Sequence, residues 1–228
     1  WDADIQDFSL KQDYAWYLNP DITLKWGFLA IHHKFNPGSV VPTGSESETI
    51  FNPFIIPAKR AVEGAAYISM DQKLGKVVTL QYGLRYSLFW NVGKGQQFIY
   101  DNGMRQLPTD TLFFDRFETI NTYHGPEPRF AANFKINELN SIKLNYMMTR
   151  QYLHLISGST VTSPLDIWVP ADPYIPPGIS HQIAVGYFRN FWDNKLETSV
   201  ELYYKKQNQL VDYIDNAELL LNDKIETQ

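Results

Sequence analysis

Four residues carry rings that could bind a ligand by stacking: Tyr123, His124, Trp168 and Tyr174. All four lie in long stretches rich in Pro, Gly, Ser and Thr, a composition typical of loops. Aromatic side chains on the loops of a rigid scaffold can stack on a sugar or a siderophore. The competing interpretation, which we favour, is that these rings close a hydrophobic cluster between the loops.

The remaining histidines argue against a metal centre. His32 and His33 are adjacent, and neighbours on a strand point to opposite faces, which disfavours a shared metal ion. His154 and His181 each stand alone near an expected strand end, where a hydrogen-bonded rim position is the usual outcome. The "GKG" at 93–95 lacks the spacing of a phosphate loop. The sequence therefore predicts no metal site, no cofactor and no enzymatic activity.

The composition limits the class of protein. The chain has 228 residues and a net charge of −5, so bulk attraction to nucleic acid is not expected. It has no cysteine, which excludes a disulfide scaffold and a thiolate metal site. Aromatic residues make up 15% of the chain, a rich share. No apolar run is long enough for a membrane-spanning helix.

The elements that must position these residues are strands. Residues 195–210, "KLETSVELYYKKQNQL", alternate apolar and polar side chains over about twice the usual strand length of 5–6 residues. The same alternation recurs in seven other segments: 8–18, 22–30, 62–70, 78–90, 130–136, 142–148 and 183–187. We therefore expect about eight long strands and no helix of comparable length.

The connections between these strands alternate strictly in length. Tight turns are expected at 18–21, 71–75, 137–141 and 191–194, and long connections at 36–58, 91–128 and 156–180. In an up-and-down meander every second connection falls at the same end of the sheet. All tight turns are therefore expected at one end and all long loops at the other.

This sorting is typical of an outer-membrane β-barrel, which has short periplasmic turns and long extracellular loops. We predict an all-β chain that forms an antiparallel up-and-down transmembrane β-barrel, here an internal segment of about eight strands. Its apolar face would meet lipid, and its polar face, with Glu63, Arg85, Lys143 and Glu201, would line the lumen and touch cargo, a plug or one another. The competing fold is a soluble β-sandwich with an aromatic-rich core.

The second half of the chain also resembles a known family. The quoted stretches are "GPEPRFAANFKINELNSIKLNYMMTRQYLHLIS" at 125–157, then "SPLDIWVP" and "GYF" with the "SVELYYK" strand, within 163–228. These resemble the barrel of TonB-dependent outer-membrane receptors, most closely the branch with a carboxypeptidase-regulatory-like domain ahead of the plug. The first half is similar only in the style of its strands.

The resemblance implies a receptor of about 22 strands around a plug, in the outer membrane of a Gram-negative cell. Residues 1–228 are interpreted as a partial barrel in which no plug, TonB box or C-terminal closing strand is visible. The implied function is uptake of a scarce nutrient, which is an oligosaccharide, a peptide or a metal chelate. The implied partners are lipid, the rest of the barrel and its plug, a TonB-type energy-transducing protein and, as a further option, a surface lipoprotein.

Two other functions stay open at this stage. One is a small self-contained outer-membrane barrel with a structural or adhesive role. The other is a soluble β-sandwich that binds carbohydrate. Neither the resemblance nor the residues identify the transported substrate.

Overall fold

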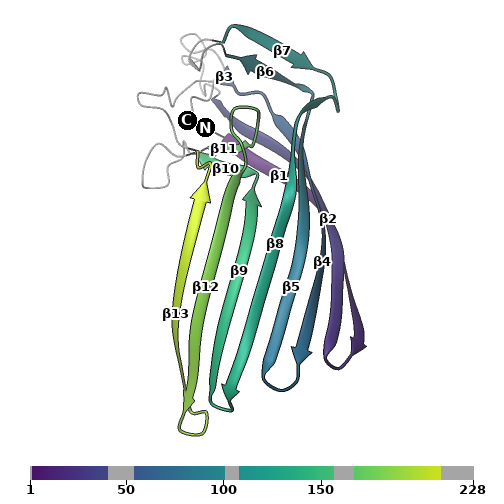
Figure 1. The fold of residues 1–228 in the computed structure, drawn as a ribbon. Coiled ribbons are helices and arrows are strands. Elements are labelled where there is room, and N and C mark those ends of the chain that lie inside the picture. Colours follow the sequence, from purple (N-terminus) through teal and green to yellow (C-terminus); the bar gives the residue numbers. More distant parts are fainter. Residues whose placement is uncertain (1, 41–53, 101–107, 157–166, 212–228) are drawn as a thin grey trace.

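A single long antiparallel sheet makes up most of the molecule (Figure 1). The computed structural model describes residues 2–40, 54–100, 108–156 and 167–211. Neighbouring strands of the sheet follow the chain in order, as β1-β2-β4-β5-β8-β9-β12-β13. The predicted up-and-down meander of eight long strands is confirmed.

The eight long strands are 12 to 19 residues in length, enough to cross the hydrocarbon core, which takes about 9–11 tilted residues. Their bounds are β1 Asp2–Asn19, β2 Ile22–Val40, β4 Lys59–Leu74, β5 Val78–Val92, β8 Thr119–Asn137, β9 Asn140–Gln151, β12 Gly178–Phe191 and β13 Leu196–Asn208. The described residues contain no helix that is both long and apolar enough to span a membrane.

The long connections carry short strands of their own. β3 (Phe54–Ile55) pairs with the end of β2, β6 (Gly95–Ile99) pairs with β7 (Asp110–Phe114), and β10 (Leu153–Ile156) pairs with β11 (Ile167–Pro170). All of them lie at one end of the sheet, and the tight turns lie at the other (Figure 1). The predicted sorting of the connections is therefore confirmed.

Two predicted boundaries are wrong. β8 begins at Thr119, so 119–128, expected to be loop, is strand and pairs with β5 from Thr119 opposite Val92 to Pro128 opposite Leu84. Pro126 and Pro128 suggested a loop, but both are accommodated in the strand. Similarly, β4 continues to Leu74 through pairing with β5, so the expected turn at 71–75 shrinks to 75–77.

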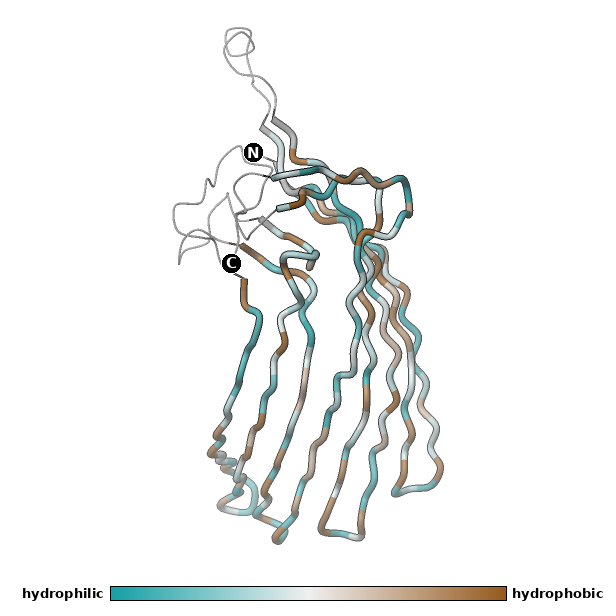
Figure 2. Tube along the Cα trace, turned by 45° about the horizontal axis from the view of Figure 1, so that its top comes forward, coloured by the Kyte–Doolittle hydropathy of each residue, from teal (hydrophilic) through white to brown (hydrophobic). Residues whose placement is uncertain are grey.

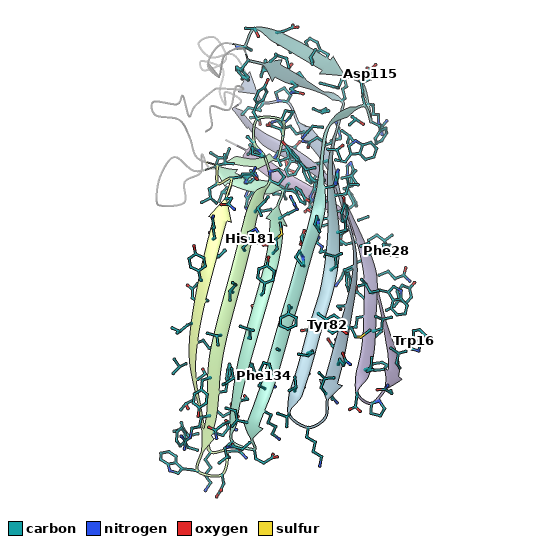
Figure 3. All side chains as sticks on the ribbon, in the orientation of Figure 1. Trp16, Phe28, Tyr82, Asp115, Phe134 and His181 are labelled. Atoms are coloured by element: carbon teal, nitrogen blue, oxygen red, sulfur yellow. The ribbon has the colours of Figure 1, made fainter. Side chains whose placement is uncertain are left out.

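The register separates the side chains into two faces. Leu84 lies opposite Ile68 and Pro128, whereas its neighbour Arg85 lies opposite Tyr67 and Glu127. Along each strand apolar and polar residues alternate (Figure 2). The face that holds Leu84, called the outer face below, also carries the exposed rings of Trp16, Phe28, Tyr82 and Phe134 (Figure 3). The face that holds Arg85 is the inner face.

The sheet has one interruption between neighbours. Pairing of β8 with β9 stops at Arg129 opposite Met147, although β9 continues to pair with β12 as far as Gln151 opposite Gly178. Beyond this point β8 contains Pro126 and Pro128, which have no N–H to donate to a ladder. The two strands separate toward the loop end (Figures 1 and 2). We call this unpaired line the β8–β9 seam.

Candidate functional site

A hairpin folds back over the inner face at the loop end of the sheet. The ring of Tyr152, just before β10, stacks on Phe89 of β5 with 5.0 Å between centroids. Its hydroxyl lies 2.7 Å from the Ser87 hydroxyl, and the Asn91 amide donates to the carbonyl of Ala171. These contacts bury Phe89, Tyr152 and Ala171 almost completely. The β10–β11 hairpin is therefore fixed to β5 rather than extended away from the sheet.

Asp172, directly after this hairpin, joins three parts of the chain. Its carboxylate accepts hydrogen bonds from the backbone N–H groups of Tyr174 and Ile175, at 2.9 and 3.0 Å. The same carboxylate lies 3.4 Å from the ammonium group of Lys59, at the start of β4. Its backbone carbonyl accepts a hydrogen bond of 2.8 Å from the Tyr123 hydroxyl of β8. The loop is thereby held at a fixed position above the sheet.

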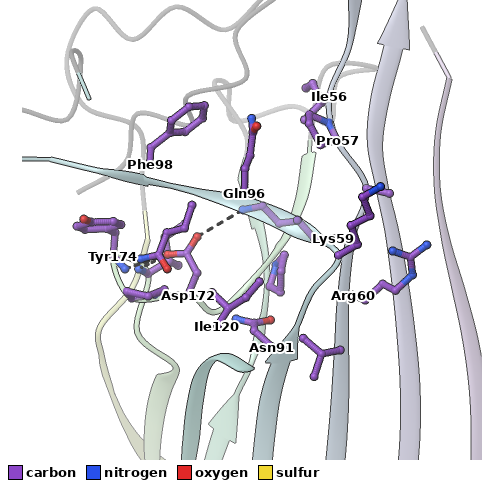
Figure 4. Close-up of a pocket in the computed structure, with 18 of the residues that line it drawn as sticks. Ile56, Pro57, Lys59, Arg60, Asn91, Gln96, Phe98, Ile120, Asp172 and Tyr174 are labelled. Atoms are coloured by element: carbon purple, nitrogen blue, oxygen red, sulfur yellow. Dashed lines mark hydrogen bonds and ion pairs between the residues drawn. The ribbon is translucent and has the colours of Figure 1, made fainter. Parts of the chain in front are cut away.

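A cavity of about 110 Å³ lies between this loop, the start of β4 and strand β6 (Figure 4). Among the described residues, its lining includes three cations, Lys59, Arg60 and Lys94, and a single carboxylate, Asp172, which Lys59 partly neutralises. Apolar and aromatic side chains complete the wall: Ile56, Phe98, Tyr100, Ile120, Tyr174 and Ile175. Such a lining favours a ligand with an anionic group and a flat or apolar face.

Of the four predicted ligand-binding rings, Tyr174 lines this cavity, where it meets Tyr100 edge to face. Tyr123 supports the site from below, because its hydroxyl holds Asp172, and its ring packs against the buried cluster around Phe89. The interpretation favoured from the sequence, that these rings join a hydrophobic cluster, agrees with how the Tyr123 ring packs. Ligand binding by Tyr174 stays a prediction.

His124 and Trp168 lie apart from the cavity. His124 belongs to β8, not to a loop, and faces outward opposite Leu88, where it stacks on Tyr86 and lies 2.6 Å from the Tyr86 hydroxyl. Trp168 lies in β11 opposite Leu155 and is 43% exposed. The structure thus separates two of the four residues that the sequence grouped together.

Sequence reasoning missed the charged residues of the cavity. Lys59 and Arg60 stand in "PAKR", directly before an alternating strand, and Asp172 stands in "PADPY". A proline-flanked charge at a strand end is a visible signal. The meeting of Lys59 with Asp172, 113 residues apart, depends on the tertiary fold.

Further along the inner face, charged side chains form a continuous row. Glu127 is fully buried and lies 3.2 Å from Arg85, which also lies 3.3 Å from Glu63. Next to Glu63, His33 lies 2.8 Å from Asp7. Glu63 and Arg85 lie on one face, as the alternation predicted, and the two pair with each other. That this face lines the lumen stays a prediction.

By register, the other two residues of this prediction share that face. Lys143 and Glu201 both lie opposite Gly186, and the Lys143 ammonium is 4.1 Å from the centre of the Phe188 ring. His32 pairs with Val62 on the outer face, away from His33. Within the residues that the structure describes, no three His, Cys, Asp or Glu side chains are grouped so that they could hold a metal ion.

Comparison with solved structures identifies the type of sheet. The FrpB iron transporter from Neisseria meningitidis (F3-3 variant) matches with a TM-score of 0.61 and 14% identity over 98% of this chain and 30% of that one. The alcaligin outer-membrane receptor FauA from Bordetella pertussis matches with a TM-score of 0.54 and 14% identity, over 99% of this chain and 33% of that one. The hemophore receptor HasR of Serratia marcescens matches with a TM-score of 0.57 and 13% identity, over 91% of this chain and 33% of that one.

The chain spans about a third of the length of these structures. No curated protein matches it. The likeness confirms, for the fold, the predicted resemblance to receptor barrels. The branch with the additional N-terminal domain stays a prediction.

A family model supplies the remaining evidence, because it extends over almost the whole chain. The model of the outer membrane protein β-barrel family matches residues 2–227. The two-faced sheet, its sorted connections and this match agree. The chain belongs to the outer membrane protein β-barrel family, and its place is the outer membrane.

Proposed function

We propose that the chain is part of the barrel wall of a receptor that takes up a scarce nutrient across the outer membrane. The cavity held by Asp172 is the observation that carries this proposal. It lies at the end of the sheet where the long connections gather, which in outer-membrane barrels is the extracellular end. A nutrient would be captured there before it enters the lumen.

The chemistry of the cavity narrows the substrate. In the part of the lining that the structure describes, three cations against one carboxylate favour an oligosaccharide, a peptide or a metal chelate that carries anionic groups. Tyr174 and Phe98 offer surfaces for a ring. The similar structures include an iron transporter and an alcaligin receptor, and both a siderophore and another anionic chelate would suit such a lining.

The receptor would need further parts. In the described sheet, β1 and β13 each pair on one side only. Unpaired backbone groups in lipid cost several kcal/mol each, so both edges would pair with further strands of the same barrel. The polar inner face would surround a plug domain. A TonB-type protein would supply the energy, and a surface lipoprotein would be an optional partner.

A small self-contained barrel remains the second candidate, because about eight strands suffice to close one. The long single-layer sheet gives no support to a soluble sandwich, which needs two packed sheets. The two membrane candidates differ in whether the cavity matters for growth.

Growth of a deletion strain tests the proposal. The strain would be complemented with the complete protein and given limiting iron chelates, oligosaccharides or peptides in turn. We expect the double substitution Lys59→Ala and Lys94→Ala to abolish growth on one of these nutrients. The control, Lys135→Ala with Lys195→Ala near the tight turns, should support normal growth. Equal growth of all strains on every nutrient would favour the structural barrel.

A further inference from the structure

A second cavity, separate from the one held by Asp172, lies on the inner face near the end of β13. It measures about 190 Å³ and is bounded by β9, β10, β12 and β13 together with residues 208–211. Polar side chains from the inner face line it, among them Thr149, Ser180, Lys205 and Gln207. Among the residues that the structure describes, the lining contains one cation and no carboxylate.

His154 of β10 also lines this cavity, and its hydrogen bonding is incomplete. The side chain is only 6% exposed, and its Nε2 atom is buried without a hydrogen-bond partner. The ring bonds the backbone of Pro176. A proline backbone has no N–H and can only accept, so the bond must be donated by the other ring nitrogen, Nδ1. Nε2 of the neutral ring therefore carries a lone pair and is an acceptor.

An acceptor buried without a donor costs free energy, and native structures rarely leave one unmatched. The cavity is partly open, so water molecules could both fill it and satisfy Nε2. A ligand hydroxyl would donate to Nε2 and fill the space as well. Burial lowers the pKa of His154, which keeps the ring neutral and Nε2 free to accept near neutral pH.

Lys205 adds the second requirement. Its side chain is on the inner face, since Lys205 lies opposite Gln182, and Gln182 lies opposite Met147 of the inner face. The side chain is exposed to solvent, and no carboxylate of the described lining residues neutralises it. An ammonium group in such a place favours an anionic oxygen.

We propose that this cavity binds a hydroxylated carboxylate of sugar-acid type. A ligand hydroxyl donates to Nε2 of His154, the ligand carboxylate pairs with Lys205, and Ser180 and Gln207 bond further hydroxyl groups. The site lies below the β10–β11 hairpin, on the lumen side of the wall. It is independent of the cavity held by Asp172, because the two share no lining residue.

Ligand-observed saturation-transfer NMR tests this directly on the complete protein in detergent. D-glucuronate is the probe. D-glucose, which lacks the carboxylate, and acetate, which lacks the hydroxyl groups, are the comparison ligands. We expect glucuronate to bind at least about tenfold more tightly than either. Equal binding of all three, or no glucuronate signal, would overturn the proposal.

Matched variants locate the site. Lys205→Gln should weaken glucuronate binding about tenfold, whereas Lys206→Gln, the neighbour on the outer face, should leave it unchanged. His154→Phe should weaken binding roughly three- to tenfold, and His181→Phe, on the outer face, should not. If His154→Phe fails to fold, the lysine pair decides alone. Equal effects of the two lysine variants would assign the binding to non-specific attraction and overturn the site. Because the readout is binding, failure here leaves the proposed nutrient uptake untouched.

Discussion

At the scale of single residues, the buried carboxylate of Glu127 depends most on a partner of opposite charge. It is fully inaccessible to solvent, and Arg85 is its nearest cation. Replacing Arg85 with Met would leave Glu127 and Glu63 without this partner. Arg129, whose guanidinium lies 3.7 Å from the Glu127 carboxylate, would remain. We therefore expect a loss of about 1–3 kcal/mol in the free energy of unfolding, the cost of lost hydrogen bonds to a buried charged group.

Urea unfolding of the complete protein in detergent measures this loss. The control is Lys135→Met, which removes the exposed pair with Glu138. An exposed pair contributes only about 0–1 kcal/mol. Similar losses for Arg85→Met and Lys135→Met would show that the inner-face row does not depend on Arg85.

His154 gives a pH dependence. Burial lowers its pKa in the folded state, so the unfolded chain binds more protons once the pH falls below about 6.5. Stability should therefore fall with pH below this value, and this contribution should vanish above about pH 7.5. The difference between the urea midpoints at pH 7.5 and pH 5.5 should be smaller in His154→Gln than in the unmodified protein. His181→Gln should keep the original difference. An unchanged difference in His154→Gln would contradict the prediction.

The residues of the site were only partly predictable from sequence. Alternation placed Glu63 and Arg85 on one face, because side-chain direction on a strand follows from position alone. The contact of Lys59 with Asp172 depends on how the hairpin folds back onto β5, and no local pattern encodes that. His124 was misplaced because two prolines concealed the strand to which it belongs.

At the scale of the strands, the two faces should respond differently to charge. Leu84 and Leu144 lie on the outer face, and Thr79 and Asn145 on the inner face. Arg at Leu84 or Leu144 near the bilayer midplane should cost about 2–4 kcal/mol, and Arg at Thr79 or Asn145 much less. Folding yields in lipid vesicles compare the four variants. Equal yields would contradict the assignment of the faces.

Most of the strands were predictable, for a physical reason. A strand with one face in lipid and one in water must alternate apolar and polar residues, so β5 and β13 can be recognised from the sequence. The start of β8 was missed because its first residues pair with β5 despite Pro126 and Pro128. Pairing across the sheet there outweighs the local preference of proline.

At the scale of the whole molecule, the sorted connections predict an orientation. Asp110 and Asp115 lie at the loop end, whereas Lys76 and Glu138 lie in tight turns. Single cysteines at these positions are clean probes, because this chain has none. A membrane-impermeant thiol reagent on intact cells should label the first two positions only. Labelling of Lys76→Cys or Glu138→Cys from outside would reverse the orientation.

The edges of the sheet predict how the 228 residues behave alone. β1 and β13 would expose unpaired backbone groups to lipid, where no water can satisfy them. We expect the isolated segment to aggregate, or to pair its edges with another copy. Refolding into detergent micelles followed by unheated gel electrophoresis measures this. A compact monomer band that shifts on heating would instead indicate a self-contained small barrel.

The β8–β9 seam has a mechanical consequence. Below Arg129 and Met147 the wall is one continuous plate, and above them it is two plates that share no ladder bonds. Bending along this line breaks no backbone hydrogen bond, so the wall is least stiff there. Tyr152, which directly follows β9, contacts Ser87 of β5 across this line and so connects the two parts of the wall. The hydrogen bonds of Asn91 to Ala171 and of Tyr123 to Asp172 cross the same line. The stiffness of the mouth of the barrel thus depends on a few side-chain contacts, and their removal would soften the wall without changing its secondary structure.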